Sequence, residues 1–308
     1  MFRSRSDATL ALSLVFAVFL WGGTNAGTRV VVTAWPPIWT GGTRFLCAGL
    51  LMITLLRWTS LLGPRTPLTP STERQLWLRG GLSLAIYIIC FNWAIRLTSA
   101  SHVALYLGAA PVWAVLWERR PGWNFETLHR YGAAFLALAG VIVLFWPSLH
   151  GTEADWRGEA LGIASSVLWT NYGRQCRVLG SALPAMETTA HTMWRAGLIL
   201  LIIGMAEVAG PADIDWRADL VAIHVYCIVA GGVAAFGIWN YALRRWPTSK
   251  VLLFNNLIPL STMLWAHYTL DEPMTATFWA AMVLVVAGVL LGQARWQQLM
   301  PGSAVPPE

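Results

Sequence analysis

Charged residues are scarce in this sequence. Asp, Glu, Lys and Arg together make up 12% of the 308 residues, whereas hydrophobic residues make up 56%. A soluble globular domain carries about 25% charged residues, so the shortage excludes that class. The composition instead indicates a membrane protein.

Acidic residues are missing from the interior of the apolar stretches. A purely cationic substrate would therefore find no counter-charge in the membrane, which favours a zwitterion, an anion or a neutral solute. Proton coupling likewise has no obvious carboxylate. Histidines could titrate instead, although a histidine at a helix end is more often structural. The candidates are His102, His191, His224 and His267.

Cysteines are few, and catalytic motifs are absent. The four cysteines all lie in apolar stretches, at spacings that match neither a disulfide framework nor a metal site. The sequence has no HExxH motif, no paired aspartates and no serine in a glycine elbow with a histidine in reach. We therefore predict no metal, no cofactor and no enzymatic activity. A membrane-embedded enzyme is the rival class, but it would need such a polar cluster.

Long apolar stretches dominate what is present. Each approaches the length of about 20 residues that crosses a hydrocarbon core as a helix. We predict an all-α integral membrane protein with ten transmembrane helices in a lipid bilayer. The stretches are 9–28, 37–57, 77–95, 102–118, 131–147, 158–178, 189–209, 220–241, 250–268 and 274–294.

One part of the sequence occurs twice. Residues 92–111 align with residues 240–259 without a gap, and seven of the twenty positions are identical. The offset is 240 − 92 = 148 residues, and it also places Trp21 on Trp169 and Gly49 on Gly197. The sequence therefore predicts two copies of one five-helix unit.

An odd number of helices inserts the second copy upside down relative to the first. We predict a first repeat over 1–150, an inverted repeat over 151–296 and a disordered tail over 297–308. Inverted repeats are typical of secondary transporters, whose substrate site lies near the midplane between the halves. The alternative is that duplication only built a stable bundle.

The positive charges predict the orientation. With the N-terminus inside, fifteen Lys and Arg residues lie on the cytoplasmic side and four outside. Both termini are therefore expected in the cytoplasm, and the net charge of +6 reflects topology and no nucleic-acid partner. The first stretch is not a cleaved signal peptide, because residues 9–28 pair with 158–178 in the repeat.

Several short motifs resemble a known family. They are WGGTN from Trp21, Arg29, the pair Pro36-Pro37, TRFLCAGLL from Thr43, Asn92 with Ala94, Pro111, Pro259, LDEP from Leu270, and Gly288. In this order they are similar to the EamA-like branch of the drug/metabolite transporter superfamily. The resemblance implies a ten-helix carrier of the bacterial inner membrane that exports a small-molecule substrate by alternating access.

Within that branch, the aromatic positions are similar to those of a bacterial aromatic amino-acid exporter. The resemblance therefore favours amino acids, including aromatic ones, as substrates. Export of drugs or other small organic solutes is the alternative. The expected partners are a small-molecule substrate, the lipid bilayer and a second copy of the chain in a homo-oligomer. The loop after the fourth stretch reads ERRPGWN and departs from the Gly-Glu turn common in such repeats.

Aromatic residues suggest a binding pocket. The chain has nineteen tryptophans, most of them expected at the membrane interfaces. Three aromatics lie near the middle of their stretches, where an indole or phenol needs a polar partner, so a cavity wall competes with simple packing. The predicted substrate-binding residues are Trp21, Tyr87, Tyr106, Trp169, Tyr172, Trp239, Asn255 and Asn256.

A second set has a predicted gating or charge role. Pro111 and Pro259 lie near the centre of their stretches and would kink the helices or merely shape packing. Arg44 and Arg195 lie inside theirs; they hold a substrate carboxylate or, as we favour, tie the helices together. The remaining members are Asn92, Asn240, His102 and Lys250.

Overall fold

The computed structural model describes residues 5–59, 65–98, 103, 106–118, 125–146, 155–208, 214–270 and 275–293. Within these ranges every regular element is a helix, which confirms the all-α prediction. The first half contains α1 (Arg5–Ala34), α2 (Pro37–Trp58), α3 (Pro70–Gln75), η1 (Leu76–Gly81), α4 (Leu82–Leu97), α6 (Ala110–Glu118) and α7 (Phe125–Phe145). The second half contains α8 (Trp156–Leu179), α9 (Ala185–Gly204), α10 (Ala218–Tyr226), η4 (Cys227–Ala235), α11 (Phe236–Arg245), α12 (Thr248–Leu252), η5 (Leu253–Asn256), α13 (Leu257–Leu270) and α14 (Ala276–Gln293).

Two long helices contain π-helical turns that the sequence analysis did not anticipate. The π-helix η1 joins α3 to α4, and the π-helix η4 joins α10 to α11. Each contains a Gly-Gly pair, Gly80-Gly81 and Gly231-Gly232. A π-helical turn leaves backbone carbonyls available to other partners and is frequent at functional sites.

The two central prolines each lie beside a short departure from α-helical geometry. Pro111 is the second residue of α6, which follows a turn at Ala109. Pro259 is the third residue of α13, directly after the 3₁₀ turn η5. A proline removes one backbone hydrogen-bond donor, so a departure from the α-helical pattern is expected beside it. Each proline therefore marks an interruption of its long segment.

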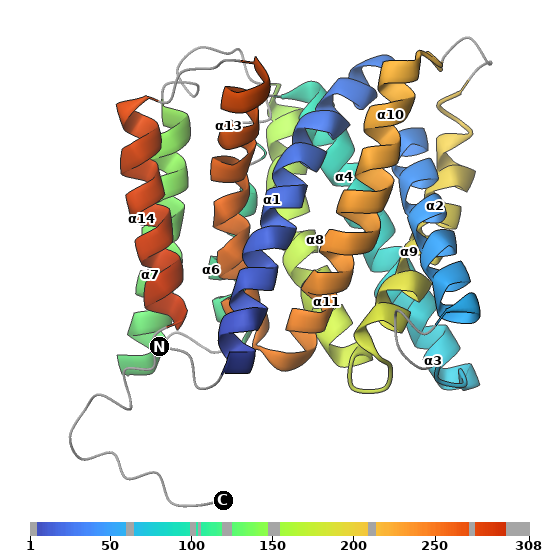
Figure 1. The fold of residues 1–308 in the computed structure, drawn as a ribbon, viewed down its shortest axis with the longest axis horizontal. Coiled ribbons are helices and arrows are strands. Elements are labelled where there is room, and N and C mark those ends of the chain that lie inside the picture. Colours follow the sequence, from blue (N-terminus) through green and yellow to red (C-terminus); the bar gives the residue numbers. More distant parts are fainter. Residues whose placement is uncertain are drawn as a thin grey trace, which may run out of the picture.

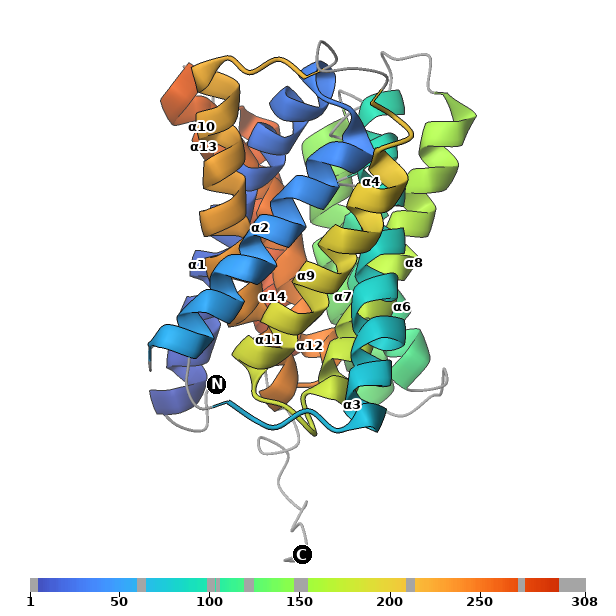
Figure 2. The ribbon, with the colours of Figure 1, turned by 90° about the vertical axis from the view of Figure 1, so that its right-hand side faces the viewer.

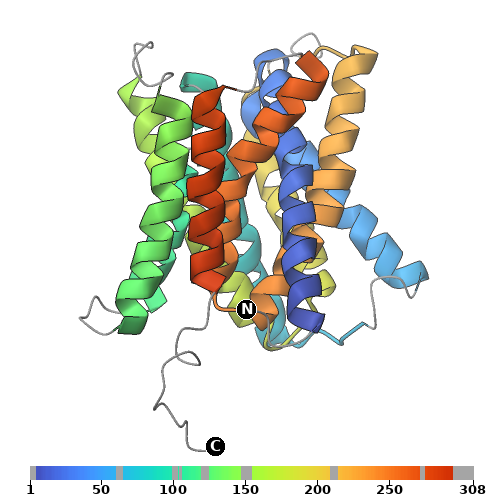
Figure 3. The same cartoon turned by 60° about the vertical axis from the view of Figure 1, so that its left-hand side comes forward.

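The helices stand side by side in one bundle (Figure 1). The pair α7 and α14 forms one end of it, and α2 with α9 forms the opposite end. Figure 2 shows α2 and α9 from that end, and Figure 3 shows α14 beside α7. Segments about 150 residues apart in the chain are thus direct neighbours.

Glycines 148 residues apart in the chain bring these helices into close contact. A Cβ on Gly49 would lie 2.3 Å from the backbone N of Trp194, and one on Gly197 would lie 2.2 Å from that of Leu46. The offset of 148 converts the first contact into the second with the partners exchanged. The pair α7 and α14 repeats this arrangement, with Gly140 against Val285 and Gly288 against Ala137. Such contacts require glycine because any side chain would meet backbone.

Apolar side chains cover the outside of the bundle. Among the exposed ones are Leu12 and Phe16 on α1, Ile202 on α9 and Val283 on α14. Four helical segments in the described residues are long and apolar enough to cross a membrane: 7–34, 37–58, 70–97 and 218–245. A soluble protein would not leave so much apolar surface in water, so these helices support a multi-pass membrane protein.

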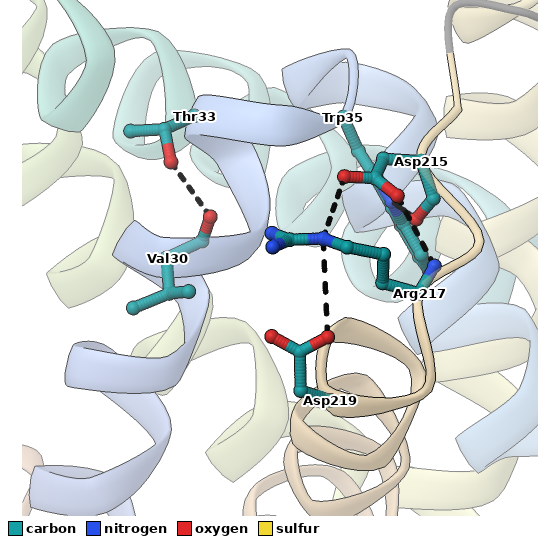
Figure 4. Close-up of polar contacts among 6 residues, drawn as sticks. All are labelled: Val30, Thr33, Trp35, Asp215, Arg217 and Asp219. Carbon is teal, nitrogen blue, oxygen red and sulfur yellow. Dashed lines mark hydrogen bonds and ion pairs between the residues drawn. The ribbon is translucent and has the colours of Figure 1, made fainter.

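The junction of α1 with α10 is polar (Figure 4). The Trp35 Nε1 donates to the backbone O of Asp215 at 2.7 Å. The Arg217 Nε lies 2.9 Å from Asp215 Oδ2 and 3.9 Å from Asp219 Oδ1. These side chains lie at the end of the bundle that the charge count predicts to face outward.

Candidate functional site: an aromatic cluster between the two halves

Five of the aromatic residues predicted to bind substrate lie in or directly against one buried cluster. Trp169 from α8 is at its centre, with its ring centroid 5.6 Å from Trp21, 5.7 Å from Trp239 and 5.1 Å from Tyr87. Tyr172 follows one turn later at 5.8 Å. Because α1 and α4 come from the first half and α8 and α11 from the second, the cluster lies at the junction of the halves.

Phe236 is a member that the sequence analysis missed. Its ring lies 5.1 Å from Trp21, 5.8 Å from Trp169 and 6.3 Å from Tyr172. The signal was available, because Phe236 precedes Trp239 by three positions and so shares one face of a helix with it. Tertiary structure was needed to see that this face meets the first half.

The cluster holds buried polar atoms without partners. Neither the Trp169 Nε1 nor the Trp239 Nε1 has a hydrogen-bond acceptor, although both side chains are buried. The Trp21 Nε1 does have one, the backbone O of Gly231 in the π-helix η4 at 3.2 Å. A buried N–H without an acceptor is costly and uncommon in a folded protein. Two indole donors are therefore available to a ligand.

Arg44 lies next to this cluster on α2. Its guanidinium carbon is 4.6 Å from the centroid of Phe45, whose ring in turn lies 5.6 Å from Phe236. Its Nη1 donates to Thr28 Oγ1 at 2.8 Å, and its Nε has no partner. Only 7% of the residue is exposed, and no carboxylate of the described residues pairs with it. A buried cation without a counter-ion is expensive.

Arg195 on α9, unlike Arg44, has a carboxylate partner, although its Nε is also without a hydrogen-bond partner. Its Nη2 forms an ion pair with Glu73 of α3, and its Nη1 donates to the backbone O of His191 at 3.0 Å. The guanidinium also lies over the ring of Trp194, 4.2 Å from the centroid. These contacts support the structural interpretation for Arg195. Glu73 itself was not singled out from the sequence.

The asparagines Asn92 and Asn240 connect helices within their own halves. The Asn92 Nδ2 donates to the backbone O of Pro37 at 2.8 Å, which joins α4 to the start of α2. The Asn240 Nδ2 donates to Thr189 Oγ1 at 2.8 Å, which joins α11 to the start of α9. The repeat-related residues thus make comparable helix-to-helix contacts.

Asn255 and Asn256 lie in the 3₁₀ turn η5 and are both buried. The Asn255 Oδ1 and both polar side-chain atoms of Asn256 have no partner. The backbone carbonyls that Pro259 leaves free are therefore not bonded by Asn256. Contact of Asn256 with a substrate stays a prediction.

The structure places two other predicted residues, Tyr106 and Lys250, away from the aromatic cluster and does not describe a third. The Tyr106 hydroxyl donates to Glu159 near the start of α8, and no ring contact joins it to the cluster within the described part of the chain. The Lys250 Nζ lies 4.0 Å from the ring centroid of Trp246. His102 falls outside the described residues.

Comparison with known proteins identifies the family. The model of the EamA-like transporter family matches the chain twice, over residues 9–146 and 156–292. The chain belongs to the EamA-like transporter family. The resemblance found in the sequence motifs is thereby confirmed, and the relatives named below are transporters or efflux pumps.

Named relatives cover nearly the whole chain. An uncharacterized transporter of Archaeoglobus fulgidus is 26% identical over 309 residues, which covers 96% of this chain and 100% of the relative. The uncharacterized inner membrane transporter YedA of Escherichia coli is 27% identical over 90% of this chain and 88% of its own length. A probable amino-acid metabolite efflux pump of Escherichia coli is 25% identical over 96% and 98%. One crystal structure, 22% identical, matches with a TM-score of 0.73 over 94% of this chain and 96% of its own, which shows the shared fold.

Proposed function

We propose that this member of the family exports amino acids, aromatic ones among them, by alternating access between two inverted five-helix halves. The observation that carries the proposal is the aromatic cluster around Trp169, because helices of both halves contribute to it. A flat apolar side chain stacks well between such rings.

The polar atoms beside the rings suit the carboxylate of an amino acid. A ligand site is usually apolar with a few polar groups that fix orientation. The unpaired indole N–H groups of Trp169 and Trp239 would donate to carboxylate oxygen. Arg44 would supply the positive charge, since it is buried beside Phe45 without a carboxylate of its own. Of the two alternatives for Arg44, we therefore favour the substrate role.

The reciprocal glycine contacts support two halves that move against each other. Exchange of partners under the 148-residue offset is what a two-fold axis between the halves produces. Such an axis in the membrane plane relates the halves of inverted-repeat carriers. The interrupted segments before Pro111 and Pro259 would then give each half one bendable helix.

Counterflow in proteoliposomes tests the proposal. Vesicles loaded with unlabelled tryptophan should accumulate labelled tryptophan. Trp169→Ala should reduce that uptake by about tenfold, because it removes one aromatic ring contact and one N–H donor. Trp279→Ala is the matched control, because Trp279 is an exposed tryptophan of α14. Labelled threonine and a cationic dye are followed in parallel.

Two results would contradict the proposal. Accumulation of the dye alone would make the protein an exporter of drugs or other organic solutes. Equal loss of uptake in Trp169→Ala and Trp279→Ala would show that transport does not depend on the aromatic cluster.

A further inference from the structure

A pocket of about 330 Å³ lies between α2 and α9, apart from the aromatic cluster. The two helices touch at Gly49 and Gly197, and the pocket lies on one side of that crossing. Its lining is contributed by α2, α9 and the segment before α3, and consists of Leu50, Ile53, Leu56, Arg57, Arg65, Glu187, His191 and Trp194.

The pocket opens on the outer face of the bundle. Figure 2 shows α2 and α9 side by side on that face. Leu50 and its neighbour Leu51 are exposed there, as an apolar surface in contact with acyl chains would be. Arg57 and Arg65 belong to the positive charges from which we predict that this end of the bundle faces the cytoplasm. The pocket therefore lies at the depth of the inner-leaflet headgroups.

The charged side chains in the pocket are not paired with one another. Arg57 and Arg65 are exposed and have no hydrogen bond or ion pair among the described residues. Glu187 is only 2% exposed; its Oε1 accepts the backbone N–H of Thr66 at 2.6 Å, but its Oε2 has no donor. A buried carboxylate oxygen without a donor indicates a missing partner.

We propose that this pocket binds the headgroup of a phospholipid that carries a primary ammonium, as phosphatidylethanolamine does. Arg57 and Arg65 bind the phosphate, because arginine matches phosphate oxygens in charge and geometry. The ammonium donates to the Glu187 Oε2. The acyl chains lie against Leu50 and Ile53, outside the crossing. Basic pockets between membrane helices on the cytoplasmic side are a known mode of headgroup recognition.

Glu187 decides between headgroups. A headgroup with only negative charge would satisfy the arginines but leave the Glu187 Oε2 without a donor. A choline headgroup has no N–H to donate. Only a headgroup with both a phosphate and a primary ammonium fits all three side chains. The inference does not depend on which solute the protein transports.

Lipid retention tests the inference. The full-length protein is placed in nanodiscs with equal amounts of phosphatidylethanolamine, phosphatidylcholine and phosphatidylglycerol, extracted into detergent, and its bound lipids are counted by native mass spectrometry. We expect phosphatidylethanolamine to be retained over the other two by about tenfold, the value of one charge-assisted hydrogen bond. Glu187→Gln keeps an acceptor for Thr66 and should abolish this preference.

The double variant Arg57→Ala/Arg65→Ala should lower retention of every phospholipid, and it is decisive if Glu187→Gln does not fold, because both arginines are exposed. Arg174→Ala is the matched control, since Arg174 lines a second pocket of about 360 Å³ without an acidic residue. Equal retention of the three lipids, a preference for phosphatidylglycerol, or displacement of the lipid by free tryptophan would overturn the inference.

Discussion

Arg44 and Arg195 are the two arginines in the interior of the bundle, one on α2 and one on α9, and their surroundings differ. Arg195 has a carboxylate partner in Glu73, a backbone acceptor and an indole face. Arg44 has a hydroxyl and a phenyl ring but no carboxylate among the described residues. This comparison shows that the role of a buried arginine depends on the groups that it contacts and does not follow from residue type and depth alone. A paired arginine stabilises the fold, whereas an unpaired one is free to bind an anionic group.

Removal of the unpaired arginine should have the largest effect. Arg44→Met keeps the aliphatic volume and removes the charge, so we expect counterflow of tryptophan to fall by up to about 100-fold, the value of a charge-assisted contact with a carboxylate. Arg44→Lys, which keeps the positive charge, should lose much less counterflow. Undiminished tryptophan transport by Arg44→Met would show that the two arginines have the same structural role.

Removal of the partner of Arg195 comes next. Glu73→Ala leaves Arg195 buried without a carboxylate, as Arg44 is, and should lower the free energy of unfolding by about 2 kcal/mol. The value lies below that for a fully buried pair because the Glu73 side chain is 41% exposed. Thermal denaturation in detergent measures the change, and transport per folded protein should stay unaltered. A melting temperature equal to that of the wild type would mean that the ion pair contributes nothing.

An exposed, paired arginine should show the smallest effect. Arg217 lies between Asp215 and Asp219 in Figure 4, but its side chain is 63% exposed. Exposed ion pairs contribute about 0 to 1 kcal/mol, so Arg217→Ala should change the melting temperature by no more than a degree or two. A loss as large as that of Glu73→Ala would show that burial does not set the scale of these contacts.

The sequence indicated several of the aromatic residues that the structure brings together. Mid-stretch position identified Trp21, Tyr87 and Trp169, because an aromatic residue far from both interfaces needs a local reason. Tyr106 was added to the predicted pocket without this criterion, and its hydroxyl donates to Glu159 outside the cluster. Position along a stretch gives depth, but it does not give the direction in which a side chain points.

The π-helical turns show another limit. Nothing in the composition of residues 76–81 or 227–235 distinguishes a π-helix from an α-helix, apart from a Gly-Gly pair in each. The π-helix η4 is contacted by another helix, because the Trp21 Nε1 of α1 donates a hydrogen bond to the Gly231 backbone O. Local sequence does not contain such contacts.

The sequence by itself determined the class of the protein, its helical content and its family, because the cost of placing polar groups in lipid leaves a clear hydrophobic pattern. The sequence also predicts an internal repeat, because identical residues recur at a constant offset. Only the tertiary structure shows that Arg44 has no carboxylate partner among the described residues, that Phe236 contacts Trp21 of the first half, and that the Glu187 Oε2 has no donor. These features depend on side chains that are far apart in the chain, and only packing of the helices brings them within a few ångströms of one another or keeps them apart.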